Sequence, residues 1–324
     1  MHRTSDAIVC ILNEQDPVRR IVLRMAGNNN LLAEFGELSL DIRYRVRVYW
    51  LEKILLEMNV KGLLELSPGV RSTLITYDSM TLPLSRLVEV VKMAEAGIDA
   101  REAQAIPSRT VRLPIAFHDR WCLEYVGKYM ESVRAEAPYL PDNMEFVARC
   151  NGLSGIKEVE QYFLATEHLV IGLGDVYLGA PCAVPLDPRY RMSAPKYNPA
   201  RTMTPEGAVG IGGAFMCIYP MESPGGYQLI GRTVPIWDTW QLGAAFQEAP
   251  WLLRPFDRIR FEAVSEAELE QMREAVHSNR YQFAIEDGLF HLSAYQQFLA
   301  GIQAEADAFR AKQSRAVARA TEGY

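Results

Sequence analysis

The stretch from His168 to about Phe261 restricts the fold more than any other part of the sequence. It consists of short apolar runs separated by glycines and prolines. Both residue types interrupt long regular elements, so the runs predict short strands joined by turns. This pattern is typical of a compact β barrel or β sandwich that carries functional loops. We therefore expect an α+β protein whose C-terminal half is built on strands.

The first hundred residues predict a small α/β domain. Residues 41–58 fit both a strand alternation and a helical stripe, and the length of the stretch favours the helix. The predicted elements are a hairpin around Gly27, a helix capped by Asp41, two strands joined at residues 67–69, and a helix ended by Gly97. This order predicts an open antiparallel sheet with helices on one face.

The rest of the chain predicts a second domain and a C-terminal helix. Residues 98–109 have the composition of a linker. The elements expected after it are a strand at 109–117, helices at 119–135 and 142–164 with a break near Gly152, the strand-rich stretch, a helix with a Ser265–Glu268 capping box, a hairpin turning at Asp287-Gly288, and a long helix from Ser293. The apolar stripe of this last helix fades after Lys312, so we expect a tail that is either exposed or available to a partner.

A chain of 324 residues suits two medium domains better than one. We place an open-sheet α/β domain at 1–105, a β-barrel domain at 106–292, and the C-terminal helix and tail at 293–324.

Charge and cysteine usage exclude several functional classes. The formal net charge is −6 and no run of Lys or Arg is present, which argues against a nucleic-acid partner. The five cysteines are scattered, and none forms a CxxC pair, so a disulfide framework or a metal site is not expected. The apolar run at residues 7–12 is too short for a signal peptide, and no run approaches a membrane span. These features predict a cytoplasmic protein with reduced thiols.

Glycines cluster in three places of the strand-rich stretch. The clusters are Gly172, Gly174 and Gly179; Gly210, Gly212 and Gly213; and Gly225 and Gly226. The run GIGGAF lacks the last glycine of a dinucleotide fingerprint, and a strand-like run follows it. Glycines at barrel corners and bulges, or glycines that cradle a ligand, explain the clusters equally well.

Asp175 is a single acid among glycines and apolar residues. It is either a turn residue or a partly dry carboxylate that accepts N–H bonds from a ligand. A buried carboxylate needs a partner, and the loop PKYNPARTMTP offers Lys196 and Arg201, although this loop can equally be solvated surface.

Further along, the stretch YPMESPGGYQLIGRT brings Glu222, Gln228 and Arg232 close together. If residues 227–233 form a strand, Gln228 and Arg232 share one face, either in a polar pocket inside a barrel or on an outer surface. His118 and His168 lack partners at triad or metal-ligand spacing. The motifs GxSxG, P-loop and HExxH are absent, so nothing indicates a hydrolase with a serine or cysteine nucleophile.

Residues 172–233 closely resemble the carboxyltransferase domain of urea carboxylase. The resemblance extends from about residue 25 to about residue 312, and includes PGVRSTLITYDS and PWLLRPFDRIRFEAVSEAELEQMRE. The wider family also contains the first subunit of allophanate hydrolase, a 5-oxoprolinase subunit and a sporulation histidine-kinase inhibitor. ESPGGYQLIGRT is common to all of them, whereas YMESVRAEAPYLPDN and KYNPARTMTP resemble the urea carboxylase branch.

The resemblance implies a cyclophilin-like β barrel after the N-terminal domain. It also implies transfer of CO2 from N-carboxybiotin to a nitrogen of urea or a similar amide or guanidine. The site would lie between this half and a homologous second half, with biotin held by a partner carrier and not bound covalently to this chain. The alternatives are a non-catalytic binding subunit, as in the kinase inhibitor, and a subunit of an amide- or lactam-cleaving enzyme.

The resemblance points to Asp175 as the carboxylate that contacts the substrate. A carboxylate with a pKa of about 4 cannot fully deprotonate urea, so we expect it to accept a hydrogen bond from the attacking nitrogen. Backbone N–H groups at Gly212-Gly213 or Gly225-Gly226 would stabilise the developing oxyanion. The candidate substrate- or biotin-binding residues are Tyr177, Lys196, Asn198, Arg201, Gly212, Gly213, Glu222, Gly225, Gly226, Gln228 and Arg232.

Overall fold

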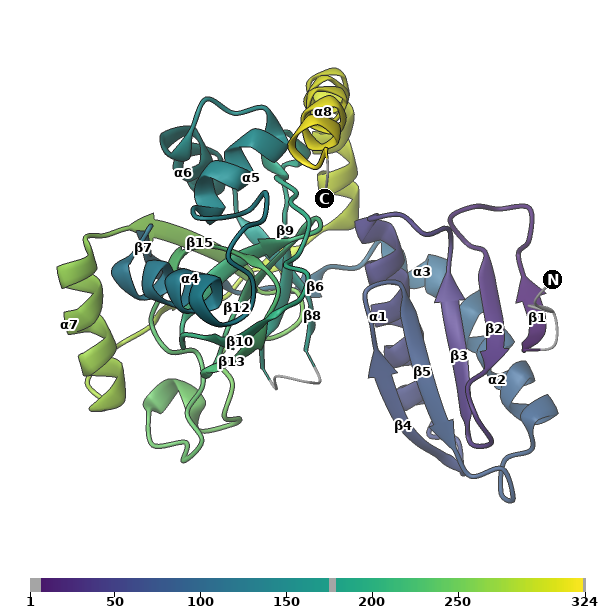
Figure 1. Cartoon of the computed structure of the whole chain (residues 1–324). Coiled ribbons are helices and arrows are strands. Elements are labelled where there is room, and N and C mark those ends of the chain that lie inside the picture. The colour runs from purple at the N-terminus through teal and green to yellow at the C-terminus, as the bar shows by residue number, and fades with distance from the viewer. Residues whose placement is uncertain (1–6, 175–178, 323–324) are drawn as a thin grey trace. The chain divides into compact units, whose positions relative to one another are not determined.

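The computed structural model describes residues 7–174 and 179–322. The chain divides into two compact units (Figure 1). One is Met1–Ile106 with Phe290–Gln296, and the other is Pro107–Leu289 with Gln297–Tyr324.

The N-terminal unit is a five-stranded antiparallel sheet among the described residues, with helices against one face (Figure 1). Its elements are β1 (Ile8–Leu12), β2 (Ile21–Met25), β3 (Asn30–Phe35), α1 (Ile42–Glu57), β4 (Leu63–Pro68), β5 (Ser72–Tyr77), α2 (Leu84–Ala96) and α3 (Ile98–Glu102). The strand order is β1-β2-β3-β5-β4. Alternate residues of β3 and β5 are buried, and α1 contacts β3, β4 and β5 from that side. The open sheet predicted from the sequence is therefore confirmed, together with its two hairpins and the Asp41 cap of α1.

Two segments of this unit differ from the expectation. Residues 8–12, which look like an isolated apolar run, form β1 and pair with β2. The segment expected to be a linker begins with α3, whose Asp99 and Glu102 bind the buried guanidinium of Arg47 at 3.0 and 2.7 Å. A buried cation requires compensating charge, so α3 is part of the unit.

The second unit contains the barrel and most of the remaining helices. Its elements, and those that lead into and out of it, are β6 (Ile106–Pro107), β7 (Thr110–Phe117), α4 (Arg120–Ser132), α5 (Asn143–Asn151), α6 (Ile156–Leu164), β8 (His168–Leu173), β9 (Pro181–Pro185), η1 (Pro188–Tyr190), β10 (Arg201–Thr204), β11 (Ala208–Gly212), β12 (Phe215–Ile218), β13 (Ser223–Gly225), β14 (Gln228–Arg232), η2 (Ala244–Phe246), β15 (Arg258–Ala263), α7 (Glu266–His277), β16 (Ala284–Glu286), β17 (Leu289–Phe290) and α8 (Leu292–Ala320).

Seven strands of the described residues close into a barrel, which confirms the predicted fold. The order is β14-β11-β12-β9-β8-β15-β7, and β7 pairs back with β14 at Phe117 and Gly231. Closure is tight at this point, because a Cβ added to Gly231 would lie 2.3 Å from the carbonyl oxygen of Ala116. On the same edge of β7, residues 110–112 pair with β16. A separate pair, β10 and β13, lies outside the barrel sheet.

Helices surround the barrel and share its core. α4 and α5 contact β14, α6 contacts β15, and α7 contacts β7. The core contains inward residues of the strands, such as Val209 and Ile211 of β11, together with helical residues such as Phe146 and Phe163. The predicted helix break is confirmed, since Gly152 caps α5 with a φ of 65°, and the Ser265–Glu268 capping box of α7 is also present.

Two predictions near the C-terminus are wrong. The expected hairpin at Asp287-Gly288 does not form: β16 pairs with β7 and β17 pairs with β6, because longer-range partners replace the local pairing. The predicted exposed tail continues α8 as far as Ala320, and the side chains of Val317 and Ala320 pack against the barrel core. No helix among the described residues is long and apolar enough to cross a membrane.

Candidate functional site

A cavity of about 500 Å³ lies against the outer side of the barrel. We call it the outer cavity. It is lined from four parts of the chain, by Gly174 and residues 180–182, by residues 196, 197 and 200, by Cys217 and Tyr219, and by residues 225–227. It therefore joins the ends of barrel strands to the loop PKYNPARTMTP and to the ESPGGYQLIGRT stretch.

Glycines on the outer face of β11 make room for the wall of this cavity. Val209 and Ile211 point into the core, so Gly210 and Gly212 face outward. The ring of Tyr227 lies directly on them. A Cβ at Gly210 would be 2.8 Å from Tyr227 Cβ, and one at Gly212 would be 2.5 Å from Tyr227 Cδ1. These two glycines thus seat an aromatic side chain that lines the cavity.

Three of the predicted site residues meet in the outer cavity. Lys196, Gly225 and Gly226 all line it, and the ammonium of Lys196 lies 4.9 Å from the centre of the Tyr227 ring. The loop is fixed to this wall because the Tyr197 N–H donates to the Gly226 carbonyl at 2.6 Å. The position of Gly225 also admits a ring, since a Cβ there would be 2.3 Å from the Tyr219 hydroxyl.

Asp175 and Tyr177 lie outside the described residues. Gly174, the residue before Asp175, lines the outer cavity, and so does Ala180 on the other side of the undescribed segment. The roles of Asp175 and Tyr177 stay predictions from the sequence.

Arg201 and Glu222 are not among the described residues that line the outer cavity. Arg201 lines a separate cavity of about 290 Å³ with residues of α4. Its guanidinium is buried, stacks on Tyr197 at 4.3 Å and donates to the Tyr227 carbonyl at 2.8 Å, so it supports the wall of the outer cavity from behind. Glu222 accepts a hydrogen bond from the Tyr125 hydroxyl.

Asn198 and Gln228 make contacts that hold the loop. The Asn198 carbonyl accepts from Arg134 at 2.7 Å and from the Tyr139 hydroxyl at 3.1 Å. Gln228 is fully buried and donates through Nε2 to the Pro195 carbonyl at 2.6 Å. Neither residue is among the described residues that line the outer cavity.

The structure contradicts part of the oxyanion hypothesis. The Gly213 N–H donates to the Ala194 carbonyl at 2.8 Å, because this turn pairs with the loop that follows β9. Gly212 lies opposite Phe215 in the strand ladder. The Gly213 N–H is therefore already used, and the pair Gly225-Gly226 is the alternative of the two that lines the cavity.

Arg232 takes part in an ion-pair cluster at the barrel wall. Its Nε lies 2.9 Å from a carboxylate oxygen of Asp119, its Nη2 binds Glu270, and its guanidinium stacks on Trp121 at 5.4 Å. The side chain of Arg232 is 6% exposed and that of Asp119 is fully buried. The predicted sharing of one strand face by Gln228 and Arg232 does not bring Arg232 into the outer cavity, because the carboxylates of Asp119, at the start of α4, and Glu270, within α7, hold its guanidinium.

Two thiols in the outer cavity were not predicted from the sequence. Cys182 and Cys217 line it, and burial raises their pKa values to about 11 and about 12. Desolvation also raises the pKa of Tyr227. These three groups are therefore protonated at neutral pH. Alternation between apolar residues in APCAVP and AFMCIY is the signal that places both thiols on the outer face of their strands.

The described residues contain no group of three or more His, Cys, Asp or Glu side chains placed to hold a metal ion. The arrangement in the outer cavity instead offers a cation, aromatic walls and backbone groups beside glycine. Such a set can bind a small planar polar molecule and stabilise negative charge that develops on it.

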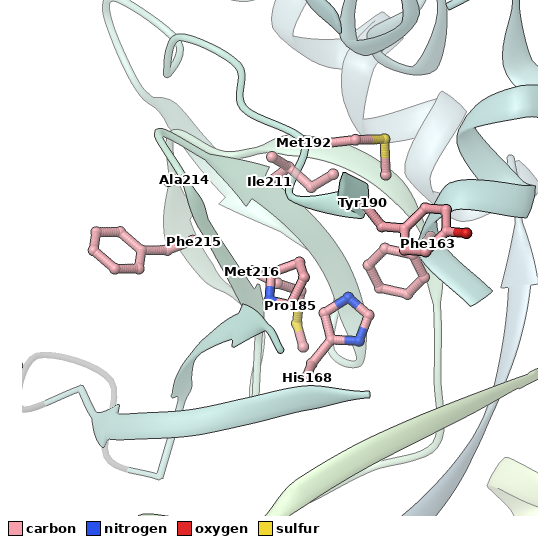
Figure 2. Close-up of a pocket in the computed structure, with 9 residues that line it drawn as sticks. All are labelled: Phe163, His168, Pro185, Tyr190, Met192, Ile211, Ala214, Phe215 and Met216. Atoms are coloured by element: carbon pink, nitrogen blue, oxygen red, sulfur yellow. The ribbon is translucent and has the colours of Figure 1, made fainter. Parts of the chain in front are cut away.

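A much smaller cavity lies at the barrel core around His168 (Figure 2). Its volume of about 10 Å³ is close to the space that one water molecule needs. Phe163, Met192 and Met216 are among the residues around it, and the His168 ring lies 4.5 Å from that of Phe163. Burial in these apolar surroundings lowers the pKa of His168 to about 3, against a small opposite effect of a backbone hydrogen bond at Ile259.

This neutral histidine predicts an acid-sensitive fold. Below pH 6.5 the unfolded chain takes up a proton at His168 and the folded chain does not, so the free energy of unfolding falls by about 1.4 kcal/mol per pH unit down to the folded pKa. His168→Leu is expected to remove this contribution, measured as a shallower loss of stability in urea titrations between pH 6.5 and 5. His291→Gln, at an exposed position, is the control and should keep the parental slope. Equal slopes for His168→Leu and the parent would contradict the prediction.

Comparisons with known proteins show similarity along most of the chain. A family model described as "Carboxyltransferase domain, subdomain C and D" matches residues 21–246. The urea amidolyase of Lachancea kluyveri is 44% identical over 280 residues, which are 86% of this chain and 15% of that protein. The solved structure of the Kluyveromyces lactis urea carboxylase is similar with a TM-score of 0.88 and 35% identity, covering 99% of this chain and 29% of that one. These matches confirm the resemblance predicted from the sequence.

A shorter relative matches almost from end to end. It is a 5-oxoprolinase subunit of Bacillus subtilis, 28% identical over 269 residues, which are 79% of this chain and 98% of that protein. The chain thus spans less than a third of the urea amidolyase and urea carboxylase, but corresponds to nearly the whole of this shorter relative.

Proposed function

The chain belongs to the carboxyltransferase-domain family, and from this membership we propose that it is one half of the carboxyltransferase of a biotin-dependent, urea carboxylase-like enzyme. The acceptor is urea or a similar small amide or guanidine. The chain acts together with a homologous other half and with partners that carry and carboxylate biotin.

The outer cavity is the observation that supports this proposal most strongly. It gathers Lys196, Gly225 and Gly226, three of the candidate binding residues predicted from the sequence, and it is also lined by Gly174, the residue directly before Asp175. Its volume of about 500 Å³ suits a ligand the size of a fused bicyclic ring with a small amide beside it.

The described lining residues fit the head of biotin. Tyr219 and Tyr227 offer apolar ring faces, and the Gly225-Gly226 backbone allows close approach because no side chain intervenes. Lys196 would hold the carboxyl group through its positive charge. When bound there, carboxybiotin supplies an activated carboxyl group.

The proposal assigns a task to each of these groups and to Asp175. Asp175 accepts a hydrogen bond from the substrate nitrogen and orients its lone pair for attack. Lys196 and a backbone N–H of Gly225 or Gly226 stabilise the negative charge that develops as the transfer proceeds. Cys182, Cys217 and Tyr227 are protonated at neutral pH, so they do not serve as the proton acceptor.

Co-purification with the natural partners tests the proposal directly. The chain should be purified from its native cell with its partners, and ATP turnover measured with and without urea or guanidine. Urea- or guanidine-dependent turnover that requires this chain and a biotin-containing partner is the expected result. Recovery of no biotin protein and no homologous half would favour the non-catalytic binding role instead.

Lys196→Met is expected to lower kcat/KM for the acceptor by about tenfold in the assembled enzyme. Loss of one hydrogen bond to a charged group costs about 1.5 kcal/mol at the lower end of measured series, which corresponds to about tenfold. Lys157→Met is the matched control, because Lys157 is 87% exposed on α6 and pairs only with Glu160 among the ion pairs of the described residues. An unchanged kcat/KM in Lys196→Met would remove this lysine from the site.

A second candidate is a subunit of a 5-oxoprolinase-like, lactam-opening enzyme. The match to nearly the full length of the Bacillus subtilis 5-oxoprolinase subunit favours it. The same co-purified preparation distinguishes the two candidate functions. ATP turnover that depends on 5-oxoproline and needs no biotin would support this candidate, and urea-dependent turnover would oppose it.

A further inference from the structure

Cys182 and Cys217 face each other across two paired strands. β9 and β12 run antiparallel with Met216 opposite Ala183, so the next rung places Cys217 opposite Cys182. Opposite residues on antiparallel strands point to the same face, with Cβ atoms about 4.5–5.5 Å apart. Both side chains line the outer cavity, whereas Met216 and Ala183 belong to the core.

Glycines flank this pair of thiols on both sides. Gly172 of β8 lies opposite Cys182, and Gly210 of β11 lies opposite Cys217. The rung therefore runs glycine, cysteine, cysteine, glycine across four neighbouring strands. No atom of residues 7–174 and 179–322 lies within 4 Å of a Cβ built on Gly172, so these residues leave that side of the thiol pair open.

The surroundings favour a shared ligand over a disulfide. All five cysteines, including these two, are free thiols. The expected Cβ separation is at or above the longest that disulfides commonly show, about 4.5 Å. Thiol–disulfide exchange also needs a thiolate, and burial keeps both thiols protonated.

We infer that Cys182 and Cys217 form a vicinal dithiol site for soft, thiophilic ions, with trivalent arsenic as its ligand class. Two thiols on one face at this separation can both bond one arsenic atom, and sulfur is a soft ligand atom that favours soft ions. With a monosubstituted arsenical bearing two hydroxyl groups, two As–S bonds form and two As–O bonds break. The two thiol protons leave with the hydroxyl groups as two water molecules, and arsenic stays trivalent, so no oxidant or reductant is consumed.

The site lies in the wall of the outer cavity, so an occupant there takes up part of the space proposed for the substrates. This consequence rests on the proposed function, whereas the dithiol site itself does not. We therefore expect the bound arsenical to inhibit acceptor-dependent turnover of the assembled enzyme.

Binding of phenylarsine oxide to the full chain tests the site without any activity measurement. Intact-mass spectrometry should show one tightly bound phenylarsenic group per chain, released by a small dithiol but not by an equal concentration of a monothiol. Cys182→Ser and Cys217→Ser should each weaken binding by about a hundredfold or more, because the second bond of a chelate is intramolecular. Cys10→Ser, which removes a half-buried thiol of the N-terminal unit, is the matched control and should bind as the parent does.

Two results would overturn the inference. One is an undiminished adduct in the Cys182→Ser/Cys217→Ser double variant, and the other is equal affinity of both single variants and the parent. Circular dichroism and the melting temperature of each variant establish that it is folded, and Cys→Ala versions serve if a serine variant is not. An adduct that forms as expected without inhibiting turnover leaves the dithiol site standing and contradicts the proposed function of the cavity.

Discussion

Asp175→Asn is expected to lower carboxyl transfer by about a hundredfold in the assembled enzyme and to leave the fold intact. Asparagine keeps the size of the side chain but offers a neutral oxygen to the substrate N–H in place of a carboxylate. Loss of one hydrogen bond that stabilises the transition state costs about 3 kcal/mol, which corresponds to about a hundredfold in rate. The measurement is kcat of acceptor-dependent ATP turnover, with the melting temperature recorded in parallel.

Asp307→Asn is the control for this experiment. Asp307 is an exposed carboxylate on α8 that pairs with Arg310 at 3.2 Å, so its loss should change turnover by less than about twofold. Near-normal turnover in Asp175→Asn would remove this carboxylate from the mechanism. A large drop accompanied by a lower melting temperature would instead indicate a structural role for Asp175.

Arg232→Met is expected to destabilise the folded chain by about 3–5 kcal/mol, the range measured when one partner of a buried ion pair is removed. The substitution leaves the fully buried Asp119 carboxylate without its nearest cation. Asp119 also caps α4 by accepting the Cys122 N–H at 2.8 Å, so the charge cannot simply move into solvent. Urea denaturation of the isolated chain measures the change, and the double variant Arg232→Met/Asp119→Asn should recover part of it.

The surface pair of Arg254 and Glu248 provides the comparison. Both side chains are more than half exposed, and Nη2 of Arg254 lies 2.6 Å from Oε2 of Glu248. Exposed pairs contribute about 0–1 kcal/mol, so Arg254→Met should change stability by no more than that. If both substitutions destabilised the chain equally little, the cluster around Arg232 would not be structural, and the ligand-binding role predicted from the sequence would regain support.

Local signals in the sequence predicted much of the fold because the structure uses them locally. The cap at Asp41, the left-handed Gly152 and the capping box at Ser265 each satisfy helix ends with neighbouring atoms, so a short window contains the information. The strand-rich stretch predicted a barrel or a sandwich for the same reason, since its turns are encoded by glycine and proline, and the family resemblance is what implied the barrel. Where pairing depends on distant strands, prediction failed, as it did for the hairpin expected at Asp287-Gly288, whose strands pair with β7 and β6 instead.

The candidate site was predictable only in part. The candidates Lys196, Gly225 and Gly226 meet in the outer cavity. The sequence grouped Arg232 with Glu222 and Gln228 because the three lie close in sequence, but carboxylates of Asp119 and Glu270 hold the side chain of Arg232. The cysteines lie 35 positions apart in the printed sequence, and only the pairing of β9 with β12 brings them together.

The way the barrel closes has a consequence for synthesis of the chain. β7 pairs along one edge with β15, in parallel, and along the other with β14 and β16, all of them far along the chain. The Arg109–Asp257 ion pair at the base of β7 joins positions 148 apart. A ribosome must therefore make more than half of the second unit before β14 can pair with β7, and more still before β15 and β16 can, which predicts slow folding of this unit and an aggregation-prone nascent chain. Any fragment cut between β7 and β14 would leave both edges of that strand bare, so the barrel unit cannot be shortened from within.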